Sequence, residues 1–324
     1  GRDGELRPVP QVILTAEGMD PGSSHTLRSS GVLDLADPAN ATAGESPQDF
    51  TVLPWDRVDD AQVALWDFEK GRGELVFDVD PQGDPLDLRI GDPATTTWNT
   101  RSLSLDDPMG IRSQDAATKV VDACTATDEV TLEVWVRPAS LDQTGPARLL
   151  TISGDREARN VTLAQGLADT EGDHYSARVR TTDTDDNGLP TFLTDTGVAA
   201  TVVQHVVLTR DAAGTVRIFV DGQLQSEDAR AGTFDTWSAG YGVTVGGEYT
   251  LESAVGWQGD VHMAAIHGRA LDATEIANNF AAGPDAGADA TDAPVTTRGP
   301  LLRSVRPNPF NARLTVEIAL PGSE

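Results

Sequence analysis

The sequence predicts an all-β fold in which short antiparallel strands form a sandwich or a barrel. Residues 205–226 contain three short runs in which apolar, mostly β-branched side chains alternate with polar ones. Turn sequences at 211–214 and 221–222 separate the runs, and the Asp-Gly pair at 221–222 tolerates the positive φ angles of a tight hairpin. Similar runs recur from residue 61 onwards, without the strand and helix alternation of an α/β fold.

Each element of this fold follows from a local pattern. Gly, Pro, Asp and Asn separate most of the strands, as turns require. A short helix is predicted over residues 270–281, because Asp272 can cap its first turn and Leu271, Ile276 and Phe280 then share one face. The predicted strands are residues 63–68, 74–77, 86–90, 130–136, 148–153, 161–163, 175–180, 202–209, 216–220, 242–246 and 261–266.

Composition divides the chain into four regions. Residues 1–60, rich in Pro, Asp, Ser and Gly, are predicted to be an extended lead-in with a candidate edge strand. Residues 61–283 form the β domain, and the hydrophobic content of 39% is enough for its core. Residues 284–300 are predicted to be a flexible acidic linker, followed by a single strand within 301–324, which cannot bury a core alone.

The charge balance excludes several classes of partner. The chain has 51 Asp and Glu against 24 Lys and Arg, a formal net charge of -27. Nucleic acid and anionic membrane surfaces are therefore repelled over most of the protein, whereas divalent cations are attracted. Simple solubility is the alternative explanation of this acidity.

Cysteine and hydropathy limit the remaining classes. Cys124 is the only cysteine, so an intramolecular disulfide and a cysteine-based metal site are excluded, and a small buried hydrophobic role is expected. No apolar run reaches the roughly 18 residues of a membrane-spanning helix, so no membrane insertion is expected. The first residues lack the apolar centre of a signal peptide, so an export signal would already have been removed.

Four segments, in the same order along the chain, resemble a known family. Residues 64–73 are similar to the first strand of laminin-G-like, concanavalin A-like domains, and residues 130–138 to a core strand. Residues 205–222 are similar to the central hairpin of these domains, and residues 257–276 to their last strand with its closing helix. The resemblance covers about residues 61–283. It implies an antiparallel two-sheet jelly-roll sandwich with one short C-terminal helix and extended tails, and it says little about function.

A second resemblance covers residues 304–321. The sequence Asn308-Pro-Phe-Asn311, followed by a strand that ends at Leu320-Pro321, resembles the start of a small C-terminal β-sandwich found in secreted and surface proteins of bacteria. It implies an exported bacterial protein, located outside the cell or on its surface.

Catalytic motifs are absent from the sequence. A retaining glycosidase needs two carboxylates about 5–5.5 Å apart, but Glu133 is the only acid in the strand segment 131–136. No Gly-x-Ser-x-Gly and no His-Glu-x-x-His motif occurs, and His205 is expected to be a structural imidazole within a strand. The Gly-rich segments 71–73 and 245–248 lack the lysine and the following helix that bind phosphate.

Calcium is the one cofactor that the sequence suggests. Relatives bind it at a rim of the sandwich, and Asp78, Asp80 and Asp84 lie in the matching loop. The segment 183–187 offers a second acidic cluster, whereas His262 stands where relatives often have Asp. The alternative is that these acids are ordinary turn residues.

Four aromatic residues are candidate ligand contacts, because a sugar or protein ligand needs an aromatic platform with polar neighbours. They are Trp98, Trp237, Tyr241 and Trp257, each of which has half-buried packing as its alternative role. Trp66 and Trp135 lie in the strongest strands and are expected in the core.

These observations predict a non-enzymatic extracellular module that binds a surface glycan or a protein through its loops. Two alternatives remain. One is a structural subunit of a surface layer or filament that self-assembles by strand addition through the terminal segments. The other is a glycan hydrolase or lyase with an unfamiliar arrangement of carboxylates.

Overall fold

The computed structural model describes two units of the chain. The larger is Val58–Asp285, and the smaller combines Gly1–Arg57 with Ala286–Glu324. Side chains are described only for residues within 57–284, and the terminal strands are described by their backbone. The described residues are 11–16, 24–29, 46–51, 57–69, 71–80, 82–107, 110–143, 145–168, 172–250, 255–284, 301–308 and 313–319.

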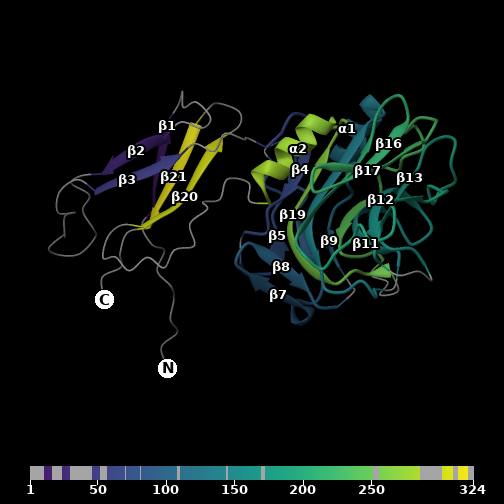
Figure 1. Ribbon diagram of the computed structural model, residues 1–324, viewed down its shortest axis with the longest axis horizontal. Helices are drawn as coiled ribbons and strands as arrows, with labels where there is room; N and C mark the ends of the chain where they lie inside the picture. Colours follow the sequence, from purple (N-terminus) through teal and green to yellow (C-terminus); the bar gives the residue numbers. More distant parts are fainter. Residues whose placement is uncertain are drawn as a thin grey trace. The chain divides into compact units, whose positions relative to one another are not determined.

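The larger unit is a jelly-roll sandwich of two antiparallel sheets (Figure 1), as the sequence predicts. Sheet I runs in the order β17-β16-β15-β10-β19-β8-β7, and β4 also pairs with β19. Its strands are β4 (Gln62–Trp66), β7 (Thr96–Asn99), β8 (Ser102–Leu105), β10 (Val130–Pro138), β15 (Gln204–Arg210), β16 (Thr215–Val220), β17 (Gln223–Ala229) and β19 (Gly259–His267).

Sheet II runs in the order β14-β13-β12-β11-β18-β9-β6-β5. The sequence did not predict β7, β8 or β9, which are only three or four residues long and carry few apolar residues. The strands of sheet II are β5 (Leu75–Val76), β6 (Leu88–Ile90), β9 (Ile111–Ser113), β11 (Ala147–Ser153), β12 (Arg159–Gln165), β13 (Tyr175–Val179), β14 (Phe192–Leu193) and β18 (Gly242–Val245).

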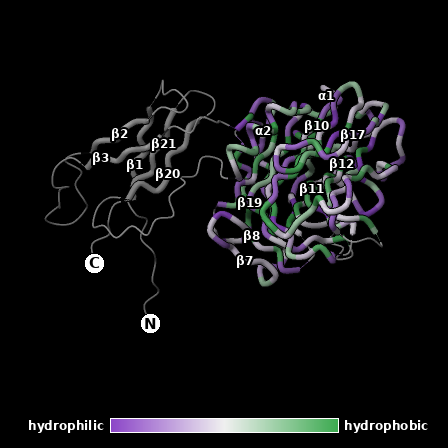
Figure 2. Tube along the Cα trace, viewed as in Figure 1, coloured by the Kyte–Doolittle hydropathy of each residue, from purple (hydrophilic) through white to green (hydrophobic). Residues whose placement is uncertain are grey.

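The hydrophobic core lies between the two sheets, because alternate side chains of each strand point to the same face. Along β10, Leu132 and Val134 are fully buried in a cluster that also contains Leu150 and Leu163 of sheet II. Each such side chain contributes about 1.5–3 kcal/mol by leaving water. Figure 2 shows the resulting succession of hydrophobic and hydrophilic residues along the strands of this unit. The opposite side chains, such as Glu133, face away from this core.

The central hairpin is confirmed by strand pairing. Strand β15 pairs with β16, and β16 pairs with β17, all antiparallel. Asp221 and Gly222 both have positive φ angles, 51° and 74°, as a two-residue turn of this hand requires.

Two helices accompany the sheets within the described residues. The predicted C-terminal helix is confirmed as α2 (Ala273–Ala282), and a capping box joins Asp272 and Glu275 at its start. Helix α1 (Thr118–Thr127) was not predicted, because its valines and threonines have low helix propensity and no side chain caps its start. Packing holds it in place, since Cys124 on its inner face is fully buried in the core. Burial also raises the pKa of the Cys124 thiol, which makes it unreactive.

The smaller unit is made from both ends of the chain. Strand β1 (Gln11–Ala16) pairs with β21 (Arg313–Ala319), which pairs with β20 (Leu301–Asn308), and β2 (Ser24–Ser29) pairs with β3 (Ser46–Thr51). Residues 301–324 therefore contain two strands rather than the predicted single strand, and β1 is an edge strand of this sheet. Most of the predicted linker, residues 285–300, lies outside the described residues. Among the described residues, none of the helices is long and apolar enough to span a membrane.

Candidate functional site

A row of polar side chains crosses the outer face of sheet II, the face turned away from the core. Strand pairing places one residue of each strand directly opposite the next, and the neighbours of these residues along each strand, such as Ile111, Leu150 and Leu163, point into the core. We call these residues the arginine–hydroxyl row. Its members, from one side of the sheet to the other, are Arg89, Arg112, Thr244, Thr151, Thr162 and Arg178.

The threonines in the middle of the row form its rigid floor. Thr151 and Thr244 are fully buried, and Thr162 is 3% exposed. The hydroxyls of Thr151 and Thr162 lie 2.5 Å apart, and Thr151 also donates to the Val161 carbonyl at 3.1 Å. Thr151 and Thr162, whose hydroxyls have fixed partners, limit the movement of the strands that carry them.

Tyr249 forms a half-buried aromatic surface at one end of the row. A Cβ atom on Gly242 would lie 2.0 Å from Cε2 of Tyr249, so the ring rests directly on the glycine backbone of β18. The Arg112 guanidinium lies over the ring, 5.4 Å from its centroid, and its Nη1 donates to the Tyr249 carbonyl at 2.6 Å. Glu248 accepts the Tyr249 backbone N–H at 2.8 Å. Ring, guanidinium and carboxylate are therefore held in one place.

Glu248 is held in place by side chains of the neighbouring strand β11. Its side chain is fully buried, forms an ion pair with Arg148 and accepts a hydrogen bond from the Ser153 hydroxyl. A buried carboxylate needs such partners because its desolvation is costly. Glu248 thereby positions the backbone at Tyr249.

Arg178 and Arg159 occupy the other end of the row. Both guanidinium groups donate to Oδ1 of Asn187, from Nη1 of Arg178 at 2.6 Å and from Nε of Arg159 at 2.7 Å. Arg159 also donates to Thr162 at 3.2 Å, and Arg178 donates to Thr191 at 2.9 Å. Two positive groups thus converge on one neutral amide oxygen.

This environment disfavours the charge of both arginines. Burial lowers the pKa of Arg159 to about 10, and the nearby charge of Arg178 adds to this effect. Burial also lowers the pKa of Arg178. Glu157 and Asp185 act in the opposite direction on both groups without reversing the shift.

Sequence reasoning missed this site because it searched for aromatic clusters and known motifs. The available signal was alternation. In β11, β12 and β18 a threonine stands between core residues, in β13 an arginine does, and in β9 Arg112 stands between the buried Ile111 and Ser113. Polar residues at every second position of neighbouring strands indicate one polar face.

The four aromatic residues predicted to contact a ligand lie in three separate segments. Trp237 and Tyr241 belong to the connection between β17 and β18, Trp98 lies on the edge strand β7, and Trp257 precedes β19. Trp257 is fully buried and donates to Gln165 at 2.8 Å.

The other three rings are also engaged by the protein. Trp237 is 7% exposed, stacks on Phe234 at 4.1 Å and donates to the Arg180 carbonyl at 2.8 Å. Trp98 and Tyr241 are half-buried against the core. A binding role for the four residues stays a prediction.

The carboxylates predicted to bind calcium make contacts within the protein. Asp78 accepts hydrogen bonds from the backbone N–H groups of Leu65, Asp80 and Leu86 and forms an ion pair with Lys119 at 2.6 Å. Asp80 accepts from Gln62 and Gln82, both at 2.8 Å, and Asp84 is exposed. Within the described residues, no group of three or more His, Cys, Asp or Glu side chains is arranged to hold a metal ion. Calcium binding stays a prediction.

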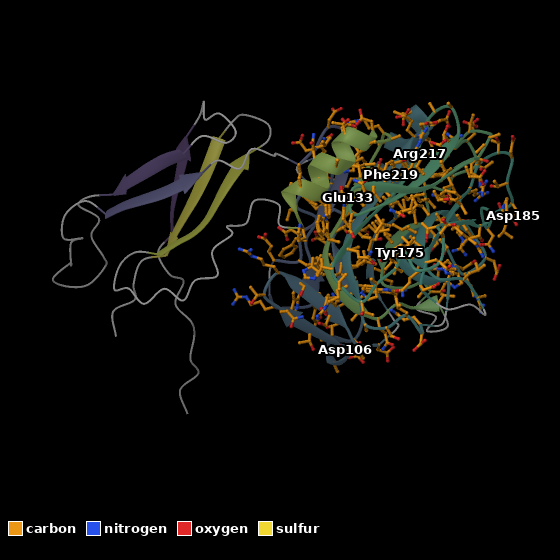
Figure 3. The ribbon with its side chains drawn as sticks, in the orientation of Figure 1. Asp106, Glu133, Tyr175, Asp185, Arg217 and Phe219 are labelled. Atoms are coloured by element: carbon orange, nitrogen blue, oxygen red, sulfur yellow. The ribbon has the colours of Figure 1, made fainter. Side chains whose placement is uncertain are left out.

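A second buried polar cluster lies on the outer face of sheet I. Glu133 of β10, labelled in Figure 3, accepts a hydrogen bond from Nε2 of His205 at 2.6 Å, and its other oxygen lies 3.6 Å from Nε2 of His267. All three side chains are fully buried. His205 is therefore a buried imidazole within a strand, the position that the sequence indicates.

Helix α2 covers this cluster. Asn279 donates to Glu133 at 3.0 Å, and its Oδ1 accepts the backbone N–H of Val58 at 2.8 Å. Phe280 stacks on Trp135 and His205, with ring centroids 5.8 and 6.0 Å apart. The cluster thus fixes the last turn of α2 and the start of the sandwich to sheet I.

The two-sheet jelly roll, with a polar outer face on sheet II and a helix on sheet I, defines a lectin-like β-sandwich. A family model described as the concanavalin A-like lectin/glucanases superfamily matches residues 112–277. This range is more than half of the 324 residues, and the chain belongs to that family. The family resemblance found in the sequence is confirmed, whereas the second resemblance, at 304–321, stays a prediction. No curated protein matches the sequence.

Solved structures with a similar fold include a sialidase of Trypanosoma rangeli. Its complex with 2,3-difluorosialic acid is 16% identical, has a TM-score of 0.53, and the match covers 71% of this chain and 34% of the sialidase. Its complex with 2,3-difluoro-KDN is 15% identical, has a TM-score of 0.54, and the match covers 80% and 37%. This chain therefore spans about a third of the sialidase, and at such identities the likeness shows the fold alone.

Proposed function

We propose that the sandwich is a non-enzymatic carbohydrate-binding module that uses the outer face of sheet II. The observation that carries this proposal is the surface formed by Tyr249 and Arg112, a half-buried ring with a guanidinium held over it, 5.4 Å from its centroid. Sugars present both apolar C–H faces and hydroxyls, so an aromatic ring with adjacent hydrogen-bond donors suits them. Membership of the concanavalin A-like lectin/glucanases superfamily supports this ligand class.

The site favours binding over catalysis. Glu248, the carboxylate nearest to Tyr249 in the chain, is fully buried and paired with Arg148. A general acid or a nucleophile must reach the glycosidic bond of its substrate, and a buried ion-paired carboxylate does not. We place the module outside the cell, as a part of a bacterial secreted or surface protein, on the basis of the sequence resemblance at 304–321.

The proposal is tested by glycan binding with matched variants. The full chain is screened on a glycan array, and its affinity for the best glycan is then measured by calorimetry together with product analysis. The Tyr249→Ala variant should weaken binding about tenfold, roughly 1.4 kcal/mol, through the loss of one aromatic contact. The Arg217→Gln variant, altered on sheet I, should bind as tightly as the parent. If Tyr249→Ala binds with full affinity and Trp98→Ala loses binding, the site lies at the aromatic residues predicted from the sequence. If product analysis finds released reducing ends, the protein is an enzyme.

A further inference from the structure

Within the described residues, three arginines on the outer face of sheet II form no direct ion pair or hydrogen bond with a carboxylate, although Glu157 and Asp185 lie near enough to Arg159 and Arg178 to act on their pKa values. Arginines elsewhere on the domain are commonly ion-paired, for example Arg217 with Asp211 and Arg269 with Glu275. In the part of the chain that the structure describes, the hydrogen-bond acceptors of these three arginines are neutral. Arg112 donates to the Tyr249 carbonyl, and Arg178 donates to the Asn187 amide and the Thr191 hydroxyl. Arg159 donates to the Thr162 hydroxyl, the Asn187 amide and the Arg156 carbonyl.

This lack of carboxylate partners contrasts with the composition of the chain. Acidic residues outnumber basic ones by 51 to 24, so carboxylates are abundant as partners. Arg159 and Arg178 share one amide oxygen, burial lowers the pKa of both groups, and the charge of Arg178 lowers the pKa of Arg159 further. A further anion in direct contact with the guanidinium groups would add to the effect of Glu157 and Asp185 and offset part of the cost of burial.

The arrangement leaves hydrogen-bond donors for such an anion. Arg112 and Arg178 are half-buried rather than enclosed. Arg112 uses Nη1 and Arg178 uses Nε and Nη1 in the hydrogen bonds described, which leaves Nη2 of each group. Four strand spacings separate the two arginines in the row, and at about 4.8 Å per spacing they lie roughly 19 Å apart. A ligand that reaches both must be extended.

We infer that the ligand of this face is an acidic oligosaccharide, whose carboxylate-bearing sugars contact Arg112 at one end and Arg178 at the other. This inference rests on the proposed function and adds the chemical class of the sugar. Guanidinium groups recognise carboxylates through charge-assisted hydrogen bonds, which are about twice as strong as neutral ones. Tyr249 supplies the contact with the sugar ring beside Arg112.

The net charge of -27 does not prevent this contact. At physiological ionic strength, exposed charges more than about 8 Å away are largely screened, whereas a direct Arg–carboxylate contact is not. The surrounding acids instead repel long polyanions, so short acidic oligosaccharides are the better ligands.

The test compares two oligosaccharides that differ only in charge. Oligogalacturonate of six residues and the neutral oligomer obtained by reducing its carboxyl groups are titrated into the full chain at 0.15 M salt. We expect the acidic oligomer to bind at least about tenfold more tightly than the neutral one. Arg112→Gln and Arg178→Gln should each remove most of this preference, whereas Arg217→Gln, on sheet I, should leave both affinities unchanged.

The outcomes separate this inference from the proposed function. Equal affinity for the two oligomers, or a preference that survives both arginine substitutions, overturns the acidic class and leaves a carbohydrate-binding module. Equally tight binding of poly-glutamate of similar length, blocked by the same substitutions, assigns the face to acidic polypeptides and overturns the inference. No binding of any glycan contradicts the proposed function itself. Melting curves of the two variants establish that they are folded.

Discussion

The buried contacts of Glu133 predict a large loss of stability in the Glu133→Ala variant. The substitution removes the acceptor of His205 and of Asn279, at 2.6 and 3.0 Å, and the contact with His267 at 3.6 Å. The partners stay buried and lose their bonds. Removing one member of a buried charged group costs about 3–5 kcal/mol. In a domain of this size that corresponds to a drop in Tm on the order of 10 °C.

Urea denaturation followed by tryptophan fluorescence measures this loss, because Trp135 packs against His205. The Glu133→Gln variant keeps the shape and one oxygen, so about half of the loss is expected, roughly 2 kcal/mol. The control is Glu227→Gln on strand β17, where the Glu227 side chain is 51% exposed and the change should stay within about 0.5 kcal/mol.

The structure also predicts that helix α2 is the part of the molecule that the Glu133→Ala substitution loosens. Asn279 connects Glu133 to Val58, so Glu133→Ala should loosen α2, and a protease should cut near residue 283 faster than in Glu227→Gln. A loss below about 1 kcal/mol, or unchanged proteolysis, would show that the cluster does not hold the helix.

Three further results are expected. The hydrogen bond from Arg269 lowers the pKa of Glu275, so Glu275 stabilises the fold above its ordinary pKa of 4.5 and loses this effect as the pH falls below that value. Urea titrations should therefore show that Glu275→Gln costs stability at pH 7 and little at pH 3. Gly242→Ala places a Cβ 2.0 Å from Tyr249, so the ring must move and calorimetry should show weaker glycan binding in a protein that still folds. Calcium at about 100 times its Kd should add roughly 2.7 kcal/mol to the free energy of unfolding, and the Asp80→Asn variant should lose this gain. Identical melting curves with calcium and with a chelator would eliminate the calcium site.

The sequence predicted those parts of the fold that local chemistry determines. Alternation and turn residues placed the central hairpin, and Asp272 as the cap of the first turn placed the start of α2. Helix α1 was missed because tertiary burial of Cys124 and its neighbours overrides the low helix propensity of the segment.

The candidate site was harder to predict because it depends on strand order. Arg112 and Arg178 are far apart in the sequence, and only the pairing of β9, β18, β11, β12 and β13 aligns them in one row. The contact of Tyr249 with Gly242 joins the start of β18 to the segment that follows this strand, and no periodicity indicates it. Registers between distant strands are set by the whole sheet and cannot be read from one segment.

The hydrogen bond between Val58 and Asn279 has a mechanical consequence. The polypeptide enters and leaves the sandwich at neighbouring points, since residue 58 follows the first flanking segment and residue 279 precedes the second. Tension that pulls residues 58 and 279 apart would load this bond and α2 before the long pairings of the two sheets. The sandwich could thus remain intact under a pull that detaches the helix.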